Sequence, residues 1–205
     1  MMEHPVHQGS DAWLNLRLGH PTASEFDNLV TPEFKLRTGQ MPQTYLCEKL
    51  AEHILGKPLE SGGSWAMAQG SILEGEAVPF YEFERNVTVR RIGFVTTDDM
   101  RIGCSPDGLI DPDGGLECKC PRPDTHVSYL MGGELPAAYR AQVHGCMFVT
   151  GRAWWDFISY CRGFPPLIVR ASRDEAIQAA LKTAVDNFLT RFDTALTTLD
   201  AMKIK

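Results

Sequence analysis

Two acidic residues and a lysine stand close together near the middle of the sequence. Asp107 lies in Cys104-Ser-Pro-Asp-Gly-Leu109, and Glu117 and Lys119 lie in Gly115-Leu-Glu-Cys-Lys-Cys-Pro121. Glu117 and Lys119 are two residues apart, so on a β-strand their side chains share one face. If a turn brings Asp107 to that face, the two carboxylates repel each other and need a cation. Hard oxygen ligands of this kind suit Mg²⁺ or Mn²⁺.

A lysine beside such a cation adds a second function. An ammonium group can orient or deprotonate an attacking water while the metal stabilises charge on a phosphoryl oxygen. The alternative interpretation is a hairpin with a solvent-facing Glu–Lys pair, which is a common arrangement. The surrounding segment favours the site, because residues 102–120 are largely apolar apart from these side chains and one turn.

The elements that must position these residues alternate between helices and short strands. Helical spacing of apolar residues predicts helices over residues 11–18, 42–55, 70–83 and 137–149. Pro79 inside the third of these weakens that prediction. A long last helix is predicted to open at a capping box, Ser172-Arg-Asp-Glu175, and to run to about Met202. Strands are predicted over residues 86–96, 100–105, 116–120, 153–160 and 167–171. We therefore expect residues 1–205 to form a single α/β domain, a central mixed β-sheet flanked by helices.

Length, composition and charge set the broad class of protein. The chain has 205 residues, 43% of them hydrophobic, which is enough for a sizeable core. No segment approaches the length of a membrane span, and the first residues do not form a secretory signal, so we expect a soluble cytoplasmic protein without membrane association. The six cysteines are then expected to be reduced thiols. The net charge of −6 argues mildly against a nucleic-acid partner, and any such partner has to be reconciled with it.

Other sites are less well supported. Cys118-x-Cys120 lacks a second cysteine or histidine pair to complete a zinc site. The sequence has no Gly-x-Ser-x-Gly nucleophile motif and no phosphate-binding P-loop.

Taken together, Ser-Pro-Asp-Gly and Leu-Glu-Cys-Lys-Cys-Pro resemble the core of PD-(D/E)xK nucleases. The closest resemblance is to the bacteriophage lambda exonuclease or YqaJ-type alkaline exonuclease family. Other stretches resemble further motifs of that family in order and spacing. They are Gln8-Gly-Ser-Asp-Ala-Trp13 through Leu16-Arg-Leu-Gly19 to Thr22-Ala-Ser24, then Gly70 to Glu74, and Ala141-Gln142-Val143. The resemblance covers nearly the whole chain and implies a restriction-endonuclease-like fold.

The resemblance implies roles for the central residues. Asp107, Glu117 and the backbone carbonyl of Cys118 would bind Mg²⁺, with Mn²⁺ as its substitute, and Lys119 would act on the water nucleophile. Glu74 would serve a second metal or its water shell, with Glu76 as the nearest competitor for that role. Gln142 would lie near the reacting phosphate; its alternative is a polar residue on an amphipathic helix.

The resemblance also implies residues that recognise a DNA end. Arg17, Ser24 and Ser105 would bind a terminal 5′-phosphate, which suits a guanidinium fork with hydroxyl donors. Without the resemblance, Arg17 is an ordinary surface residue and Ser24 a helix cap. Met67 would be an apolar wedge between base pairs, and core packing is its equal alternative.

The resulting expectation is a Mg²⁺-dependent 5′→3′ exonuclease on double-stranded DNA. It would release mononucleotides and leave 3′ single-stranded tails for recombination, in a phage or prophage, with a single-strand annealing protein as partner. The relatives form ring-shaped homotrimers, and a ring that encloses its substrate accounts for the net charge of −6. Arginines 37, 85, 90 and 91 are candidate phosphate contacts inside such a ring.

Two alternatives stay open at this point. The first is a structure- or sequence-specific endonuclease with the same catalytic residues. The second is a catalytically inactive DNA-end-binding protein, which the joint presence of Asp107, Glu117 and Lys119 disfavours.

Overall fold

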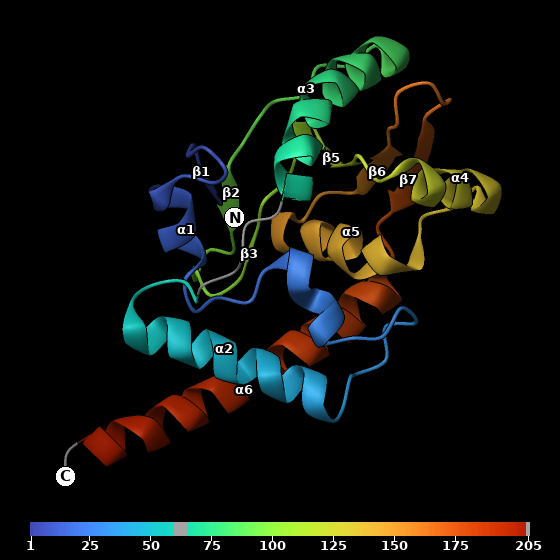
Figure 1. Cartoon of the computed structure of the whole chain (residues 1–205). Helices are drawn as coiled ribbons and strands as arrows, with labels where there is room; N and C mark the ends of the chain where they lie inside the picture. The colour runs from blue at the N-terminus through green and yellow to red at the C-terminus, as the bar shows by residue number, and fades with distance from the viewer. Residues whose placement is uncertain (60–64, 204–205) are drawn as a thin grey trace.

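A mixed β-sheet with helices on both faces forms the centre of the structure (Figure 1). This computed structural model describes residues 1–59 and 65–203, with the side chains of residues 65–72 and 203 outside the description. The predicted α/β class, with a mixed sheet flanked by helices, is confirmed.

Four strands form the main sheet in the order β4-β5-β6-β7. They are β4 (Gly108–Ile110), β5 (Gly114–Lys119), β6 (Trp154–Ser159) and β7 (Leu167–Ser172). β5 and β6 run parallel, and the two outer pairs are antiparallel. The parallel pair requires a crossover, which is supplied by α4 (Pro123–Gly132) and α5 (Ala137–Thr150).

The alternation of side chains along β5 decides which helix covers which face. Leu116 and Cys118 join an apolar cluster with Ala77, Val78 and Tyr81 of α3 (Trp65–Arg85). Glu117 and Lys119 point to the other face, which α5 covers. The strand therefore buries apolar side chains under α3 and presents its charged ones beside α5.

Two glycines at the start of β5 permit the close approach of β6. A Cβ atom at Gly114 would lie 2.1 Å from the Trp154 ring, and one at Gly115 would lie 2.3 Å from the Trp155 ring. Glycine at both positions lets the two indole rings lie against the backbone of the neighbouring strand.

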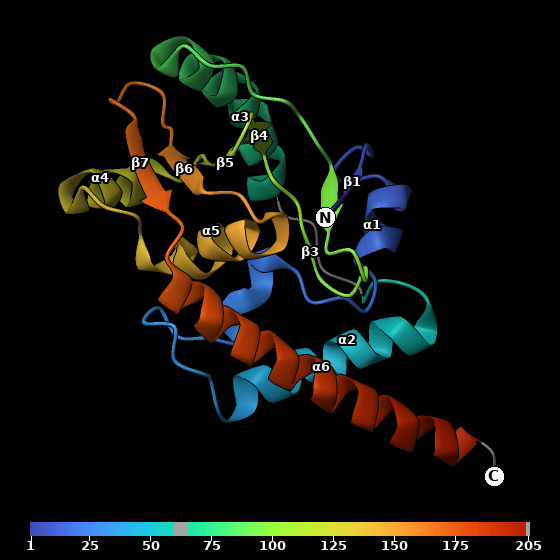
Figure 2. The ribbon, with the colours of Figure 1, turned by 180° about the vertical axis from the view of Figure 1, so that it is seen from behind.

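A second layer of helices completes the larger core. The helix α2 (Gln40–Leu55) contacts α6 (Glu175–Lys203), and both lie below α5 in Figure 1 and again in the reverse view of Figure 2. The 3₁₀ helix η1 (Ala23–Asn28) packs against α5. Phe26, Tyr45, Leu181 and Phe188 are fully buried among these elements.

A small antiparallel sheet joins the N-terminus to two strands from the middle of the chain. Its strands are β1 (Met2–His4), β2 (Phe94–Thr96) and β3 (Gly103–Cys104), in that order. The helix α1 (Asp11–Arg17) follows β1 and begins at Ser10, whose side chain accepts a hydrogen bond from the Trp13 N–H. This sheet and α1 flank the residues that approach β5.

Several predicted elements are wrong in detail. The strand predicted over residues 86–96 is ordered as a strand only at Phe94–Thr96, because residues 86–93 pair with the sheet only through the bridge Arg90–Leu109. The strand predicted over 100–105 reduces to β3. Pro79 does not interrupt α3, since its neighbours Ala77, Val78 and Tyr81 are held by packing on the sheet.

The start of the last helix also differs from the prediction. Ser172 ends β7, where it pairs with Trp154, and so its backbone belongs to the sheet. Asp174 caps α6 instead, with Oδ1 accepting from the N–H groups of Ala176 and Ile177. Local sequence patterns did not predict β1, β4, η1 or α4.

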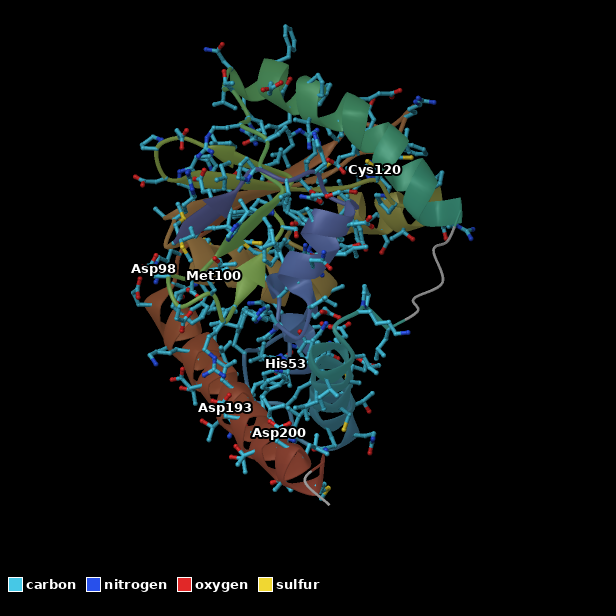
Figure 3. The ribbon with its side chains drawn as sticks, turned by 90° about the vertical axis from the view of Figure 1, so that its left-hand side faces the viewer. His53, Asp98, Met100, Cys120, Asp193 and Asp200 are labelled. Carbon is cyan, nitrogen blue, oxygen red and sulfur yellow. The ribbon has the colours of Figure 1, made fainter. Side chains whose placement is uncertain are left out.

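Acidic side chains of α6 lie away from β5. Figure 3 shows Asp193 and Asp200 at the opposite end of the molecule from Cys120, which directly follows β5. Asp193 pairs with Arg101 at 2.6 Å. All six cysteines are free thiols, as predicted. Within the described residues, no helix has both the length and the hydropathy to cross a bilayer.

Arg152 holds the turn that joins β4 to β5, and we expect its loss to be costly. The buried guanidinium donates to the carbonyl oxygens of Ile110, Pro112 and Gly114 and pairs with Asp111 at 2.9 Å. Arg152→Ala leaves these acceptors without their donor, so the free energy of unfolding in urea should fall by about 3 kcal/mol or more. Arg122→Ala, at an exposed ion pair, should change it by about 1 kcal/mol at most. Equal effects of the two variants would contradict the role given to Arg152.

Candidate active site

Glu117 and Lys119 meet near the carboxyl end of β5. The Lys119 Nζ atom lies 2.6 Å from Glu117 Oε1. Glu117 is 1% exposed, whereas the Lys119 side chain is 28% exposed. The pair joins a buried carboxylate to a partly accessible ammonium group, as the two-residue spacing predicts.

Asp107 reaches the same strand from the segment between β3 and β4. Its Oδ2 atom accepts a hydrogen bond of 2.6 Å from the backbone N–H of Cys118. Gly108 begins β4 and pairs with Leu116 in the antiparallel register, which fixes the approach of the preceding aspartate. Asp107, Glu117 and Lys119 are therefore brought together.

The helix α5 contributes two further side chains to this site. Gln142 Nε2 donates to Glu117 Oε1 over 2.6 Å. One turn earlier, the Tyr139 ring lies 5.2 Å from Lys119 Nζ and stacks on Phe157 at 5.1 Å. Gln142 thus lies beside Glu117, while its place near a reacting phosphate stays a prediction. Tyr139 was not predicted; its position three residues before Gln142 is the signal that places it on the same helix face.

The third predicted acidic residue, Glu74, comes from α3 and is engaged by an arginine. Arg91 Nη1 lies 2.6 Å from Glu74 Oε1 and donates to the backbone carbonyl of Asp107 at 2.9 Å. The competitor Glu76 pairs instead with Arg162. Glu74 therefore faces the site, and Glu76 does not take its place.

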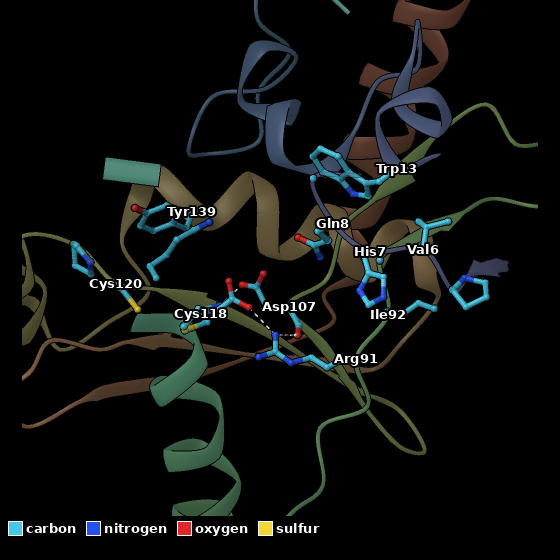
Figure 4. A pocket seen from close by; sticks show the side chains of 16 residues that line it. Val6, His7, Gln8, Trp13, Arg91, Ile92, Asp107, Cys118, Cys120 and Tyr139 are labelled. Carbon is cyan, nitrogen blue, oxygen red and sulfur yellow. Dashed lines mark hydrogen bonds and ion pairs between the residues drawn. The ribbon is translucent and has the colours of Figure 1, made fainter. Parts of the chain in front are cut away.

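Five of the residues described so far line one open pocket (Figure 4): Asp107, Lys119, Glu74, Arg91 and Tyr139. The segment of residues 5–9 and Trp13 close it on the side of α1. Figure 4 shows Tyr139 and Trp13 on either side of Asp107. Arg91 reaches towards Asp107 from the segment that precedes β2.

Asp107 and Glu117 share an environment that opposes their ionisation. Burial raises the pKa of Asp107 well above its usual value, and the carboxylates of Glu117 and Glu74 add to the increase. Burial also raises the pKa of Glu117, an effect that Lys119 opposes. Burial lowers the pKa of Lys119, but Glu117 and Asp107 outweigh it and raise that pKa above its ordinary value. Lys119 is thus an ammonium group in this site.

The residues present fit a divalent cation. Glu117 Oε2 is buried and has no hydrogen-bond partner among the described residues. Together with the second oxygen of Asp107, it offers hard anionic donors in a site with excess negative charge. The described residues contain no cluster of three or more His, Cys, Asp or Glu side chains arranged as a metal site. The fit therefore depends on the two carboxylates of Asp107 and Glu117.

The chain's own residues define what this site can do. A divalent cation bound here would supply Lewis-acid stabilisation of a phosphoryl oxygen. Lys119 is positioned to hold and orient a water beside Glu117. Gln142 fixes the rotamer of Glu117 through its amide N–H, and the Tyr139 face limits where the ammonium group can move.

A second polar cluster joins α1, η1 and the segment after β3. Arg17 donates to Ser105 Oγ at 3.1 Å, to Thr22 Oγ1 at 3.2 Å and to Ser24 Oγ at 3.4 Å. Burial lowers the pKa of Arg17. The structure thus assembles Arg17, Ser24 and Ser105, the three residues that the sequence analysis grouped.

Two members of this cluster were not predicted as site residues. The Trp13 indole N–H donates to Ser105 Oγ at 2.9 Å, and its ring lies 4.5 Å from the Arg17 guanidinium carbon. Thr22 is fully buried and accepts from Arg17. Both residues stand in the stretch from Gln8 to Ser24, whose motif was noted without a role for either side chain.

Cys118 and Met67 are the two remaining residues that were predicted to belong to the site. The Cys118 side chain packs against α3 and its N–H binds Asp107, while metal binding by its carbonyl stays a prediction. Met67 lies in α3, but its side chain is outside the described side chains, so the wedge stays a prediction.

The raised pKa of Asp107 gives a prediction about stability. A carboxyl whose pKa is raised on folding destabilises the folded state only at pH values at which the same carboxyl is ionised in the unfolded chain. For an aspartate this means pH values above ~3.9. Asp107→Asn keeps an acceptor for the Cys118 N–H and removes the charge. In EDTA at pH 7 its free energy of unfolding in urea should exceed that of the wild type by about 1 kcal/mol or more. At pH 4 the gain should nearly vanish, and an equal gain at both pH values would contradict this cause.

Comparison with known proteins agrees with the geometry. The YqaJ-like viral recombinase domain matches residues 12–153. An alkaline exonuclease from Laribacter hongkongensis has 29% sequence identity and a TM-score of 0.85 over 96% of this chain and 100% of its own. Its complex with dAMP gives 30% identity and a TM-score of 0.86 over the same shares.

A more distant structure shares the fold alone. A phage-related exonuclease from Haemophilus somnus has 13% identity and a TM-score of 0.69, with 88% of this chain and 96% of that one covered. No curated protein sequence matches the chain. From the domain match and the full-length structural agreement, the chain belongs to the YqaJ-like viral recombinase family, and it is a nuclease with the PD-(D/E)xK fold of the alkaline exonucleases.

Proposed function

We propose that the protein is a Mg²⁺-dependent 5′→3′ exonuclease that degrades one strand of double-stranded DNA from its 5′ end. The observation that carries this proposal is the position of the Arg17 cluster beside the carboxylates. Ser105, which accepts from Arg17, is two residues from Asp107, which contacts β5. Two residues of chain span at most ~7 Å, a distance on the scale of one nucleotide.

The Arg17 cluster has the chemistry of a terminal phosphate site. A guanidinium group with three hydroxyls around it matches the charge and the acceptor geometry of a phosphate monoester. Trp13 holds both the guanidinium group and Ser105, so the cluster is organised before DNA binds. An enzyme that binds the 5′-phosphate here would cut about one nucleotide away, which supports release of mononucleotides and a 3′ single-stranded tail.

The choice of Mg²⁺ rests on the donor set. Asp107 and Glu117 offer carboxylate oxygens, and the Cys118 carbonyl is a further oxygen donor, which suits Mg²⁺ or Mn²⁺ better than zinc. Glu74 extends the acidic surface towards a second cation or its waters. In this proposal Lys119 orients the attacking water, and Gln142 steadies Glu117 beside the reacting phosphate.

The wider assembly is also part of the proposal. A homotrimeric ring around DNA would retain the substrate by enclosure, so that a chain with net charge −6 need not bind by a uniformly basic surface. Met67 would separate base pairs at the duplex end. The 3′ tail would pass to a single-strand annealing protein during recombination of phage or prophage DNA.

Digestion of matched DNA substrates tests the proposal. With Mg²⁺, linear duplex with 5′-phosphates should be degraded to mononucleotides while covalently closed circular duplex stays intact, and EDTA should stop the reaction. Lys119→Ala should lower the rate by about 10²-fold or more, because it removes the group that orients the water. Lys182→Ala, at an exposed ion pair on α6, is the matched control and should retain the wild-type rate. Cleavage of the circle would instead indicate an endonuclease.

Arg17 gives a separate test of end recognition. Arg17→Ala should reduce the preference for 5′-phosphorylated over 5′-hydroxyl duplex by about tenfold or more, since charge-assisted hydrogen bonds to the phosphate are lost. Initial rates on the two substrates measure the preference. Arg101→Ala, which removes an exposed arginine paired with Asp193, should leave it unchanged. An unaltered preference in Arg17→Ala would remove Arg17 from the phosphate site.

A further inference from the structure

One cation of this chain already occupies the acidic pocket. Arg91 Nη1 bonds both Glu74 Oε1 and the carbonyl oxygen of Asp107, at 2.6 and 2.9 Å (Figure 4). It therefore bridges the carboxylate of α3 and the backbone of the residue that approaches β5. Its neighbour Arg90 has different partners, Glu3 and Asp111, and does not line the pocket.

The backbone that carries Arg91 is fixed, but its guanidinium group is accessible. Arg90 and Leu109 exchange two backbone hydrogen bonds of 2.8 and 2.9 Å. On the other side, Ile92 is buried in the core, and a Cβ atom at Gly93 would collide with the Val6 carbonyl. The Arg91 side chain itself is 50% exposed. The guanidinium group can thus leave Glu74 by rotation of its side chain, without movement of the surrounding chain.

Glu74 cannot serve the guanidinium group and a divalent cation equally well. Its carboxylate oxygen is engaged at 2.6 Å, and a second cation nearby would meet the positive charge of Arg91 at close range. The position between Asp107 and Glu117 is different, because Arg91 contacts only the backbone of Asp107 and neither of these carboxylates. The effect of Arg91 should be concentrated on a cation that uses Glu74.

We propose that Arg91 is a positioning residue that competes with a divalent cation for Glu74. In the cation-free site the guanidinium group neutralises Glu74 and ties it to the Asp107 backbone. A cation at Glu74 displaces the guanidinium group into the pocket, so that loading of this position costs the Arg91–Glu74 ion pair. This inference rests on the proposed divalent-cation site, and it adds a residue of this chain that sets the affinity of one part of that site.

Direct binding of Mn²⁺ tests the competition without reference to nuclease activity. Free Mn²⁺ is measured by electron paramagnetic resonance during titration of the DNA-free protein, which gives both the stoichiometry and the affinity of each position. Arg91→Ala should tighten the weaker Mn²⁺ position by about tenfold and leave the tighter one within about twofold. Where the wild type binds a single Mn²⁺ over the titrated range, the variant should bind a second.

Matched variants separate competition from a general loss of positive charge. Arg90→Ala removes a neighbouring charge that does not engage Glu74, and its effect on Mn²⁺ binding should be small. Arg91→Lys keeps the charge with a less specific donor geometry, so the Mn²⁺ affinity of its weaker position should lie between those of the wild type and Arg91→Ala. In a Glu74→Gln background, Arg91→Ala should not increase the Mn²⁺ affinity, because the carboxylate for which the two cations compete is gone. Thermal unfolding confirms that each variant is folded.

Three outcomes would overturn the inference. They are weaker Mn²⁺ binding in Arg91→Ala, an effect equal to that of Arg90→Ala, and absence of Mn²⁺ binding in both wild type and Arg91→Ala. The nuclease assay on linear duplex is read separately. If the wild type is inactive but Arg91→Ala still tightens Mn²⁺ binding, the proposed exonuclease is refuted and the competition is not. If the wild type is an active exonuclease but Arg91→Ala does not tighten Mn²⁺ binding, only the competition is refuted.

Discussion

The crowding of carboxylates around one end of β5 is the constraint on which the site depends. Glu117 is almost fully buried, Asp107 approaches within hydrogen-bond distance of the same strand, and Glu74 faces them from α3. Such an arrangement is unfavourable without compensation, and the raised pKa values of Asp107 and Glu117 express that cost. Lys119 and Arg91 supply two positive charges against three carboxylates, and the remaining negative charge is what makes the site suited to a divalent cation.

The rest of the fold holds this unfavourable cluster in place. β5 lies inside the sheet, with β4 and β6 on its two sides and helices on both faces, so its backbone cannot retreat from the charged side chains. Arg152 fixes the preceding turn through three carbonyl oxygens. Apolar packing between β5 and α3 therefore stabilises a cluster of charged side chains that would not assemble alone. Functional centres are typically stabilised by the surrounding fold in this way.

The sequence was informative where local periodicity and covalent spacing decide the structure. The two-residue spacing of Glu117 and Lys119 implied a shared face, whereas the grouping of Arg17, Ser24 and Ser105 was implied by the resemblance to a known family. It failed where tertiary packing overrides local signals. Pro79 remains inside α3 because its neighbours pack on the sheet, and the apolar residues of 86–93 form no ladder because they lack a continuous partner strand. The Arg91–Glu74 pair joins residues 17 positions apart through folding alone, and no spacing rule indicates it.

The net charge of −6 also acquires a local meaning. Several acidic residues lie far from the pocket, on α6, where Asp186 pairs with Lys182 and Asp193 pairs with Arg101. Near the proposed phosphate site, Arg17 lies among hydroxyl groups and against the face of Trp13, and Glu25 Oε2 accepts from Thr22 at 3.4 Å. The sum of charges therefore describes the outer surface more than the site, and local fields decide where a phosphate is attracted.

A terminal phosphate held by Arg17 would bring the adjacent phosphodiester towards the carboxylates, whose charge repels it until a cation and Lys119 offset that repulsion. Binding of the DNA end and loading of the cation are then mutually dependent, which follows from the charges of these few residues and not from the overall composition of the chain.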